Sequence, residues 1–152
     1  MRFTYLPVLD FPNHQKRTRY LPWIRFDIAN PKNKSEIVYP IGLIDSGSEI
    51  TFVDYEIGEE LGFDIETGKS EKVYGVGGGF IRVYYHKTIL YIQNKDLEEP
   101  IIFEDWIAFS KEKFPDTMPQ QTAILGTIGF FRHLKITFNY PKFIDIESNF
   151  SH

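Results

Sequence analysis

Short apolar stretches separated by turn residues fill the sequence from Tyr20 onward, and this pattern limits the fold more than any other feature. In several of them, such as 23–29, apolar and polar residues alternate with the period of a half-buried β-strand. The aromatic content of 16% supports this interpretation, because aromatic residues favour strands. The stretches predicted as strands are 23–29, 39–45, 87–93 and 100–110. The stretch 73–85 is predicted as strand, glycine-rich tip and strand, 123–126 is a short apolar run, and 134–147 is predicted as a hairpin around Asn139–Lys142.

Two short helices are predicted between these strands. The first spans about 55–61, with Asp54 as its N-cap and Gly62 at its end. The second spans 128–134, where apolar residues share one face and Thr127 provides the cap. Many short strands with one or two short helices predict a mainly β protein whose sheet closes into a barrel.

The remaining segments are predicted to lack regular structure. Residues 1–19 contain two prolines and mixed charges, and we expect an irregular N-terminal segment followed by a single domain over 20–152. A chain of 152 residues is long enough for one domain with a real core. The polar segment 30–36 is predicted as a turn, and 111–121, with two prolines, as a loop.

Composition and charge exclude several classes of function. The chain has no cysteine, so disulfide frameworks, thiolate metal sites and cysteine nucleophiles are excluded. Its four histidines lack the spacing of zinc ligands, and we expect neither a metal nor a cofactor. A formal net charge of −4 with scattered Lys and Arg argues against a nucleic-acid partner. No apolar stretch resembles a signal peptide or a membrane span, so we expect no membrane contact and a cytoplasmic location.

Two glycine-containing motifs are interpreted as turns. The stretch 67–70, Thr-Gly-Lys-Ser, ends like a phosphate-binding loop but has Phe63 where the first glycine of that motif is required. The glycine run at 75–79 is followed by an alternating strand pattern, whereas a dinucleotide fingerprint leads into a helix. Glycines between two strand-like stretches predict the tip of a hairpin.

The segment Asp45-Ser46-Gly47 carries the strongest chemical signal. An aspartate directly after a buried apolar strand is costly unless its carboxylate is hydrogen-bonded. Ser46 and Gly47 supply a hydroxyl and backbone N–H groups in a tight turn. Taken alone, however, Asp-Ser-Gly is most often an ordinary turn at the end of a strand.

Together with its surroundings, this segment resembles the aspartic peptidases of the retropepsin and pepsin kind. Residues 42–54 resemble their active-site loop, with Thr51 at the hydroxyl-bearing position that follows the signature. The stretch 73–85 resembles the flap that closes over a bound peptide, and 129–147 resembles the short helix and final strands. The hydrophobic-hydrophobic-Gly motif that packs behind the catalytic loop is matched by Ile124, Leu125 and Gly126. Thr127 stands where viral members carry an arginine, so their ion pair between subunits is absent.

The resemblance implies a retropepsin-like aspartic endopeptidase that acts on a peptide or protein substrate. Asp45 would supply one carboxylate of a catalytic pair, with Ser46, Gly47 and Thr51 supporting the loop. Two carboxylates in contact share one proton and divide the roles of base and acid. Because the chain has a single Asp-Ser-Gly, the second carboxylate must be Asp45 of another copy in a homodimer. The residues expected to cover the substrate are Gly75, Val76, Gly77, Gly78, Gly79 and Phe80.

Two alternatives remain open at this point. The first is a peptide-binding or interaction module that has the same fold but does not cleave. The second is a plain β-barrel domain in which Asp45 only closes a turn. Dimerisation separates the plain domain from the other two hypotheses, and cleavage of an unfolded protein separates the peptidase from the binding module.

Overall fold

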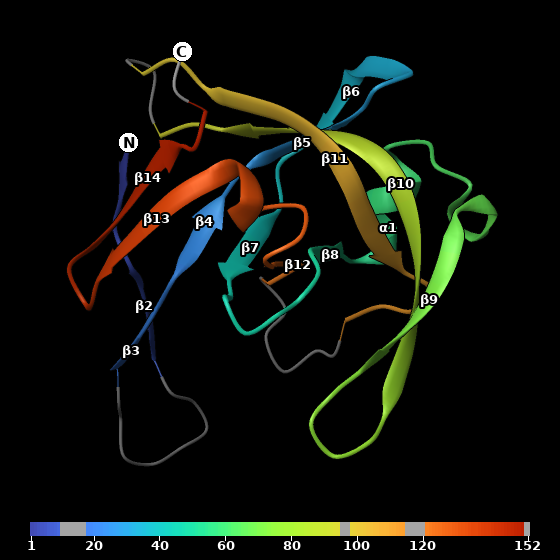
Figure 1. The fold of residues 1–152 in the computed structure, drawn as a ribbon, viewed down its shortest axis with the longest axis horizontal. Coiled ribbons are helices and arrows are strands. Elements are labelled where there is room, and N and C mark those ends of the chain that lie inside the picture. The colour runs from blue at the N-terminus through green and yellow to red at the C-terminus, as the bar shows by residue number, and fades with distance from the viewer. Residues whose placement is uncertain (10–17, 95–97, 115–120, 151–152) are drawn as a thin grey trace.

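The computed structural model describes residues 1–9, 18–94, 98–114 and 121–150. Within these ranges a nine-stranded, curled sheet forms the body of the molecule (Figure 1), which confirms the mainly β, barrel-like class. Its strand order is β4 (Trp23–Arg25), β7 (Ile41–Ile44), β12 (Ala123–Leu125), β8 (Phe52–Val53), β11 (Ile101–Ser110), β10 (Phe80–Ile92), β5 (Asp27–Asn30) and β6 (Asn33–Val38), with β9 (Lys69–Tyr74) also paired to β10.

Two smaller sheets complete the described part of the chain. The three-stranded sheet has the order β1 (Arg2–Phe3), β14 (Phe143–Ser148) and β13 (Leu134–Asn139), and the two-stranded sheet pairs β2 (Leu6–Leu9) with β3 (Thr18–Leu21). The β1 and β14 strands are antiparallel neighbours, so the first and last strands of the fold lie side by side (Figure 1). The predicted final hairpin is confirmed, because β13 and β14 pair from Leu134–Ser148 to Asn139–Phe143.

The predicted first helix is present as α1, Tyr55–Glu60. The carboxylate of Asp54 accepts a 3.0 Å hydrogen bond from the N–H of Glu56, as an N-cap requires. Gly62 follows the helix with φ +80°, a left-handed conformation that favours glycine. Leu61 is fully buried and packs into the main core, so α1 closes one side of the curled sheet.

The predicted second helix over 128–134 is wrong. Only a three-residue 3-10 helix, η2 (Phe131–His133), is present. Gly129 has φ +92°, and a left-handed residue in the first turn prevents an α-helix from starting there. The Thr127 hydroxyl does not cap a helix, because it donates to the carbonyl oxygen of Glu49 at 2.9 Å.

The expectation of irregular structure over 1–19 is also corrected, since β1 and β2 lie in this segment. Long-range pairing explains the difference. Arg2 lies opposite Asp145 in the register of β1 and β14, and its guanidinium donates to both carboxylate oxygens at 2.8 Å. Pro7 is tolerated in β2 because that strand pairs only with β3 and leaves its other edge free of a ladder within the described residues.

Two further strand boundaries differ from the prediction. The polar segment 30–36 is not all turn, because its second half belongs to β6, an exposed edge strand. Polar residues suit an edge strand, so local composition concealed it. The stretch 23–29 is divided at Phe26, where the chain passes from β4 beside β7 to β5 beside β10. The second strand of the predicted hairpin 73–85 continues into the strand predicted at 87–93, and together they form one long strand, β10.

Candidate active site

Asp45 directly follows β7, and the surrounding backbone fixes its position. Its N–H donates to the carbonyl oxygen of Leu125 at 3.0 Å, and its own carbonyl oxygen accepts from the N–H of Ser48 at 3.1 Å. The N–H of Gly47 donates to carboxylate oxygen Oδ1 of Asp45 at 2.9 Å. The carboxylate is therefore oriented by its own loop while Asp45 remains partly accessible to solvent.

Ser46 and Gly47 form the exposed tip of this loop. A Cβ built on Gly47 would lie 3.1 Å from Oδ1 of Asp45, so a larger residue would crowd the carboxylate. The Ser46 side chain faces solvent in the single chain. Its expected role in joining two copies stays a prediction.

A second loop, 126–128, holds the first one from behind. The N–H groups of Thr127 and Ile128 donate to the carbonyl oxygens of Ser48 and Glu49 at 2.9 and 2.8 Å. In the return direction, the N–H of Thr51 donates to the carbonyl oxygen of Ile128 at 2.9 Å. These bonds bring together two segments that are far apart in the sequence, and they restrict the movement of the Asp45 loop.

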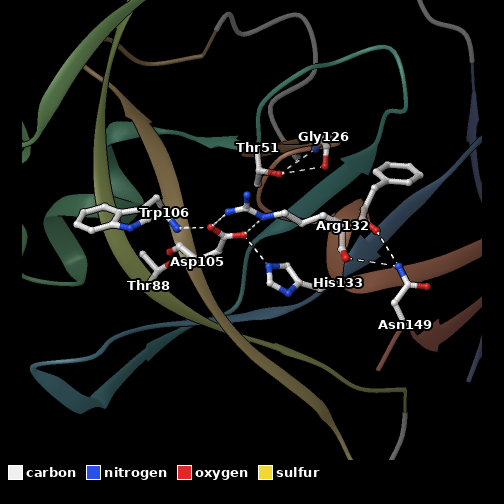
Figure 2. A network of polar contacts seen from close by, with 9 residues as sticks. Thr51, Thr88, Asp105, Trp106, Gly126, Arg132, His133 and Asn149 are labelled. Carbon is white, nitrogen blue, oxygen red and sulfur yellow. Dashed lines mark hydrogen bonds and ion pairs between the residues drawn. The ribbon is translucent and has the colours of Figure 1, made fainter. Parts of the chain in front are cut away.

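Gly126 and Thr51 form the centre of this contact (Figure 2). The Gly126 N–H donates to the Thr51 side-chain oxygen Oγ1 at 2.9 Å. A Cβ on Gly126 would lie 2.1 Å from the carbonyl oxygen of Ile50, which no backbone tolerates without moving. Thr51 is only 1% exposed, so its hydroxyl serves this internal contact.

Ile124 and Leu125 occupy two different environments. Both belong to β12, which runs parallel to β7 with Ile124 opposite Leu43 and Leu125 opposite Ile44. Leu125 is fully buried and packs behind the loop. Ile124 instead lines an open cleft, so one of the two residues faces the space where a ligand would lie.

The glycine-rich segment forms the predicted hairpin tip between β9 and β10. Gly77 and Gly78 have φ +100° and +88°, and the Gly75 N–H donates to the Gly79 carbonyl oxygen at 2.9 Å. Figure 1 shows this hairpin projecting beyond the body of the molecule. Val76 is fully exposed at its end. The position suits a flap, and its closure over a substrate stays a prediction.

A small apolar cluster connects the base of this hairpin to the active-site loop. Its buried members are Ile50, Val83 and Ala108, and Phe52, Val73 and Tyr85 pack against it. The Tyr85 hydroxyl donates to the Glu71 carboxylate at 2.5 Å across the two strands of the hairpin. Burial and this hydrogen bond raise the pKa of Tyr85 far above its ordinary value, so the hydroxyl keeps its proton at neutral pH.

A cleft with a volume of about 710 Å³ lies between the hairpin and the segment 110–114. Asp45 is not part of its wall. The cleft nevertheless ends beside the active-site loop, because Ile124 precedes the residue that accepts the Asp45 N–H bond. The lining residues are Phe52, Phe80, Ile81, Arg82, Tyr84, Ser110, Lys111, Glu112, Lys113, Phe114, Gln121 and Ile124.

A buried polar network on β11, which was not predicted from the sequence, lies around Asp105 (Figure 2). The Asp105 side chain is 3% exposed, and its carboxylate accepts hydrogen bonds from Nε of Arg132 and the N–H of Trp106 at 2.6 and 2.7 Å. A ring nitrogen of His133 lies 2.6 Å from the same carboxylate. Burial alone would raise the pKa of Asp105, but the bonds from Arg132 and His133 outweigh it and lower the pKa.

This network attaches η2 to the sheet, and η2 directly follows the loop behind Asp45. The Asn149 side chain adds further bonds to the carbonyl oxygens of Phe131 and Arg132. A sequence signal for it exists, because strand alternation places Asp105 on the same inward face as Phe103 and Ile107. A charged residue on a buried face requires partners, and that requirement marks Asp105.

The described residues contain no group of three or more His, Asp or Glu side chains arranged to hold a metal ion. Among the same residues, no helix is long and apolar enough to cross a membrane.

Comparisons with known proteins give structural matches only. No protein-family model matches the sequence, and no curated protein matches it either. A crystal structure of a retropepsin-like aspartic protease from Rickettsia conorii matches with a TM-score of 0.51 at 13% identity, covering 96% of this chain and 93% of that chain. A structure of EIAV protease with an inhibitor matches with a TM-score of 0.41 at 16% identity, covering 78% of this chain and 88% of that chain. At such identities the Rickettsia match shows the fold alone, which is retropepsin-like.

Proposed function

From this retropepsin-like fold, we propose that the chain is an aspartic endopeptidase whose catalytic site forms when two copies pair. Each copy contributes Asp45, and a water molecule is held between the two carboxylates. The observation that carries the proposal is the Asp45 loop itself, in which a partly accessible carboxylate is oriented by the Gly47 N–H and braced by 126–128. A turn-closing aspartate has no need of this second loop.

The other buried or hydrogen-bonded aspartates support the need for a second copy. Asp54 caps α1, Asp105 is bound by Arg132, Asp145 is paired with Arg2 on the outer sheet, and Asp27 accepts a hydrogen bond from the Gln93 side chain. Each of these carboxylates therefore has a structural partner and lies on a different element from Asp45. A second Asp45 is the group that a two-carboxylate mechanism requires.

The chemistry follows from two carboxylates that share one proton. The ionised carboxylate removes a proton from the water, whose oxygen attacks the carbonyl carbon of the peptide bond. The protonated carboxyl group donates a hydrogen bond to the carbonyl oxygen as negative charge develops there. The C–N bond then breaks, and the departing nitrogen takes up the proton that the first carboxylate removed from the water. The products are a new carboxyl terminus and a new amino terminus.

The remaining predicted residues have supporting roles in this proposal. The tip 75–80 closes over an extended substrate and supplies backbone hydrogen bonds to it. Gly47 orients the carboxylate, and Ser46, exposed at the loop tip, contacts the partner copy. Thr51 and Gly126 hold the two loops together, and Ile124 contacts the substrate from the cleft.

One observation favours a second candidate function, the binding of peptides without cleavage. The cleft of about 710 Å³ and the hairpin beside it are built within one chain, whereas the pair of carboxylates is not. A chain that stays monomeric would still offer this cleft to a peptide. The two functions differ in whether a bound peptide is cut.

The deciding experiment is incubation of the full chain with a peptide library over a range of pH, followed by mass spectrometry. We expect new termini with the wild type and none with Asp45→Asn. Asp64→Asn is the matched control, because Asp64 is exposed and its side chain caps nothing. Peptides that bind to the wild type but remain uncut under every condition would favour the binding module.

A further inference from the structure

Positive charge borders the apolar cleft beside the active-site loop. The cleft is lined by three cations, Arg82, Lys111 and Lys113, and by one anion, Glu112. The whole chain has the opposite sign, with a formal net charge of −4. A local excess of cations along a cleft raises the concentration of anionic ligands near it. The cleft is therefore suited to a ligand that carries negative charge.

The register of the hairpin strengthens this observation. Arg82 on β10 lies directly opposite Lys72 on β9, so both side chains are on the same face of the hairpin. Like charges directly opposite one another destabilise a strand pair. Lys72 also lies over the ring of Phe80, with its ammonium 4.7 Å from the ring centroid. Two cations are thus kept together on one face of the hairpin, one on each strand, and Arg82 is the one that lines the cleft.

Among the three cations that line the cleft, Arg82 is the one without an ion-pair partner in the described part of the chain, whereas Lys113 lies 3.7 Å from the Glu56 carboxylate. The Arg82 Nη1 donates to the neutral Ser70 hydroxyl at 3.4 Å, and no carboxylate lies within ion-pair distance of Arg82 among the residues that the structure describes. The neighbouring Lys111, whose N–H donates to the Arg82 carbonyl oxygen, is paired with Glu66 at 3.2 Å. That pair is exposed on both sides, and such pairs exchange partners at little cost.

Most of the remaining lining residues are apolar or aromatic, with Ser110 and Gln121 as the polar exceptions. Phe52 and Phe114 contact one another with ring centroids 5.4 Å apart, and Ile124 lies on the same wall. A large apolar side chain therefore fits the body of the cleft, and a negative group fits its border near Arg82. A peptide can carry both groups, a large apolar side chain and a negatively charged one.

We propose that Arg82, assisted by Lys72 and Lys111, selects substrates with an Asp or Glu side chain within a few residues of a large apolar side chain. This inference rests on the proposed function, because it specifies the substrate class of the same site. The planar guanidinium binds a carboxylate through two parallel N–H···O bonds, which lysine does not reproduce. The bound carboxylate also relieves the repulsion between Arg82 and Lys72.

The test uses peptides that share one apolar cleavage site and differ only in a single Glu or Gln placed at each flanking position in turn. For at least one position, we expect the wild type to show a kcat/KM about tenfold higher for Glu than for Gln. Arg82→Gln should abolish this preference, and Arg82→Glu should invert it in favour of Lys peptides. Lys87→Gln, which removes the same charge from the same strand outside the cleft, should retain the preference.

Three outcomes are distinguishable. Equal cleavage of Glu and Gln peptides at every position overturns this inference and leaves the peptidase proposal standing. A preference that Lys87→Gln loses as fully as Arg82→Gln also overturns it, because general attraction by net charge then explains the result. If the wild type cuts no peptide, the proposed function fails, and binding of the same labelled peptides still decides this inference. Tighter binding of Glu peptides that depends on Arg82 supports it, and equal binding contradicts it.

Discussion

The N–H of Gly126 donates a 2.9 Å hydrogen bond to the side-chain oxygen of Thr51, a residue 75 positions earlier in the chain. This bond lies between the loop that carries Asp45 and the loop that braces it. Thr51 is buried, and the Gly126 N–H has no other hydrogen-bond acceptor among the described contacts. The position of the Asp45 loop therefore depends on a buried hydroxyl that serves an internal contact.

The first prediction concerns a variant without the Thr51 hydroxyl. Thr51→Val keeps the shape of the side chain but leaves the Gly126 N–H without an acceptor, so we expect the free energy of unfolding to fall by about 1–3 kcal/mol. We expect kcat to fall by about tenfold to a hundredfold, because small displacements of catalytic groups are costly. Thr51→Ser retains the oxygen and should restore most of the kcat. Urea unfolding and peptide cleavage measure the two effects, and a Thr51→Val enzyme with wild-type kcat would contradict the assigned role.

The second prediction concerns the close approach at Gly126. In Gly126→Ala, the new Cβ meets the carbonyl oxygen of Ile50 at 2.1 Å unless the two loops separate. We expect the free energy of unfolding to fall by about 3 kcal/mol, because a side chain that clashes with backbone cannot move away by changing its rotamer. Gly79→Ala is the control, because nothing lies within 4 Å of a Cβ at that position. Similar unfolding midpoints for the two variants would refute the argument.

The third prediction tests the flap. Gly78 has φ +88°, and a Cβ there meets nothing within 4 Å, so Gly78→Val adds backbone strain without a steric clash. We expect a lower kcat for peptide cleavage while the fold stays intact. Gly79→Val introduces the same side chain one residue later, where φ is not left-handed, and it should cost less activity. Unchanged cleavage kinetics in Gly78→Val would argue against a flap at this position.

The fourth prediction follows from the lowered pKa of Asp105. A carboxyl group whose pKa is lower in the folded state contributes stability above its unfolded pKa and loses it as pH falls through the folded pKa. At neutral pH, the free energy of unfolding of Asp105→Asn should therefore be about 1–3 kcal/mol lower than that of the wild type, because Arg132 and His133 no longer have a charged acceptor. This difference in the free energy of unfolding between the variant and the wild type should shrink as pH falls below about 4. Urea unfolding from pH 7 to pH 3 measures it, and a difference that stays constant over this range would contradict the assignment.

Local patterns predicted the parts of the fold that local chemistry determines. Alternation identified the long strands β10 and β11, and Asp54 and Gly62 marked the ends of α1. The same patterns failed where a distant partner decides the structure. Arg2 lies in a strand because Asp145 lies opposite it, and no feature within residues 1–19 reveals that pairing.

The candidate site shows the same division. The motifs around Asp45 and Gly126 were visible in the sequence, but the bond that joins Gly126 to Thr51 became visible only once β12 was seen beside β7 and β8. The partners of Asp105 lie 27 and 28 residues away on η2, the short 3-10 helix that stands where a longer helix was predicted. Neither contact follows from spacing along the chain, because each depends on how the sheet curls.

The measurement that tests the central claim most directly is cleavage by wild-type protein mixed with increasing amounts of Asp45→Asn. If each site takes one Asp45 from each of two chains, mixed pairs contain only one catalytic carboxylate and do not cut. At a total concentration where chains are paired and exchange freely, about a ninefold excess of Asp45→Asn should reduce activity per wild-type chain to about one tenth. An equal excess of Asp64→Asn, which keeps its own Asp45, should cause no such loss. A wild-type rate that is unaffected by excess Asp45→Asn would show that one chain carries a complete site and would contradict the account.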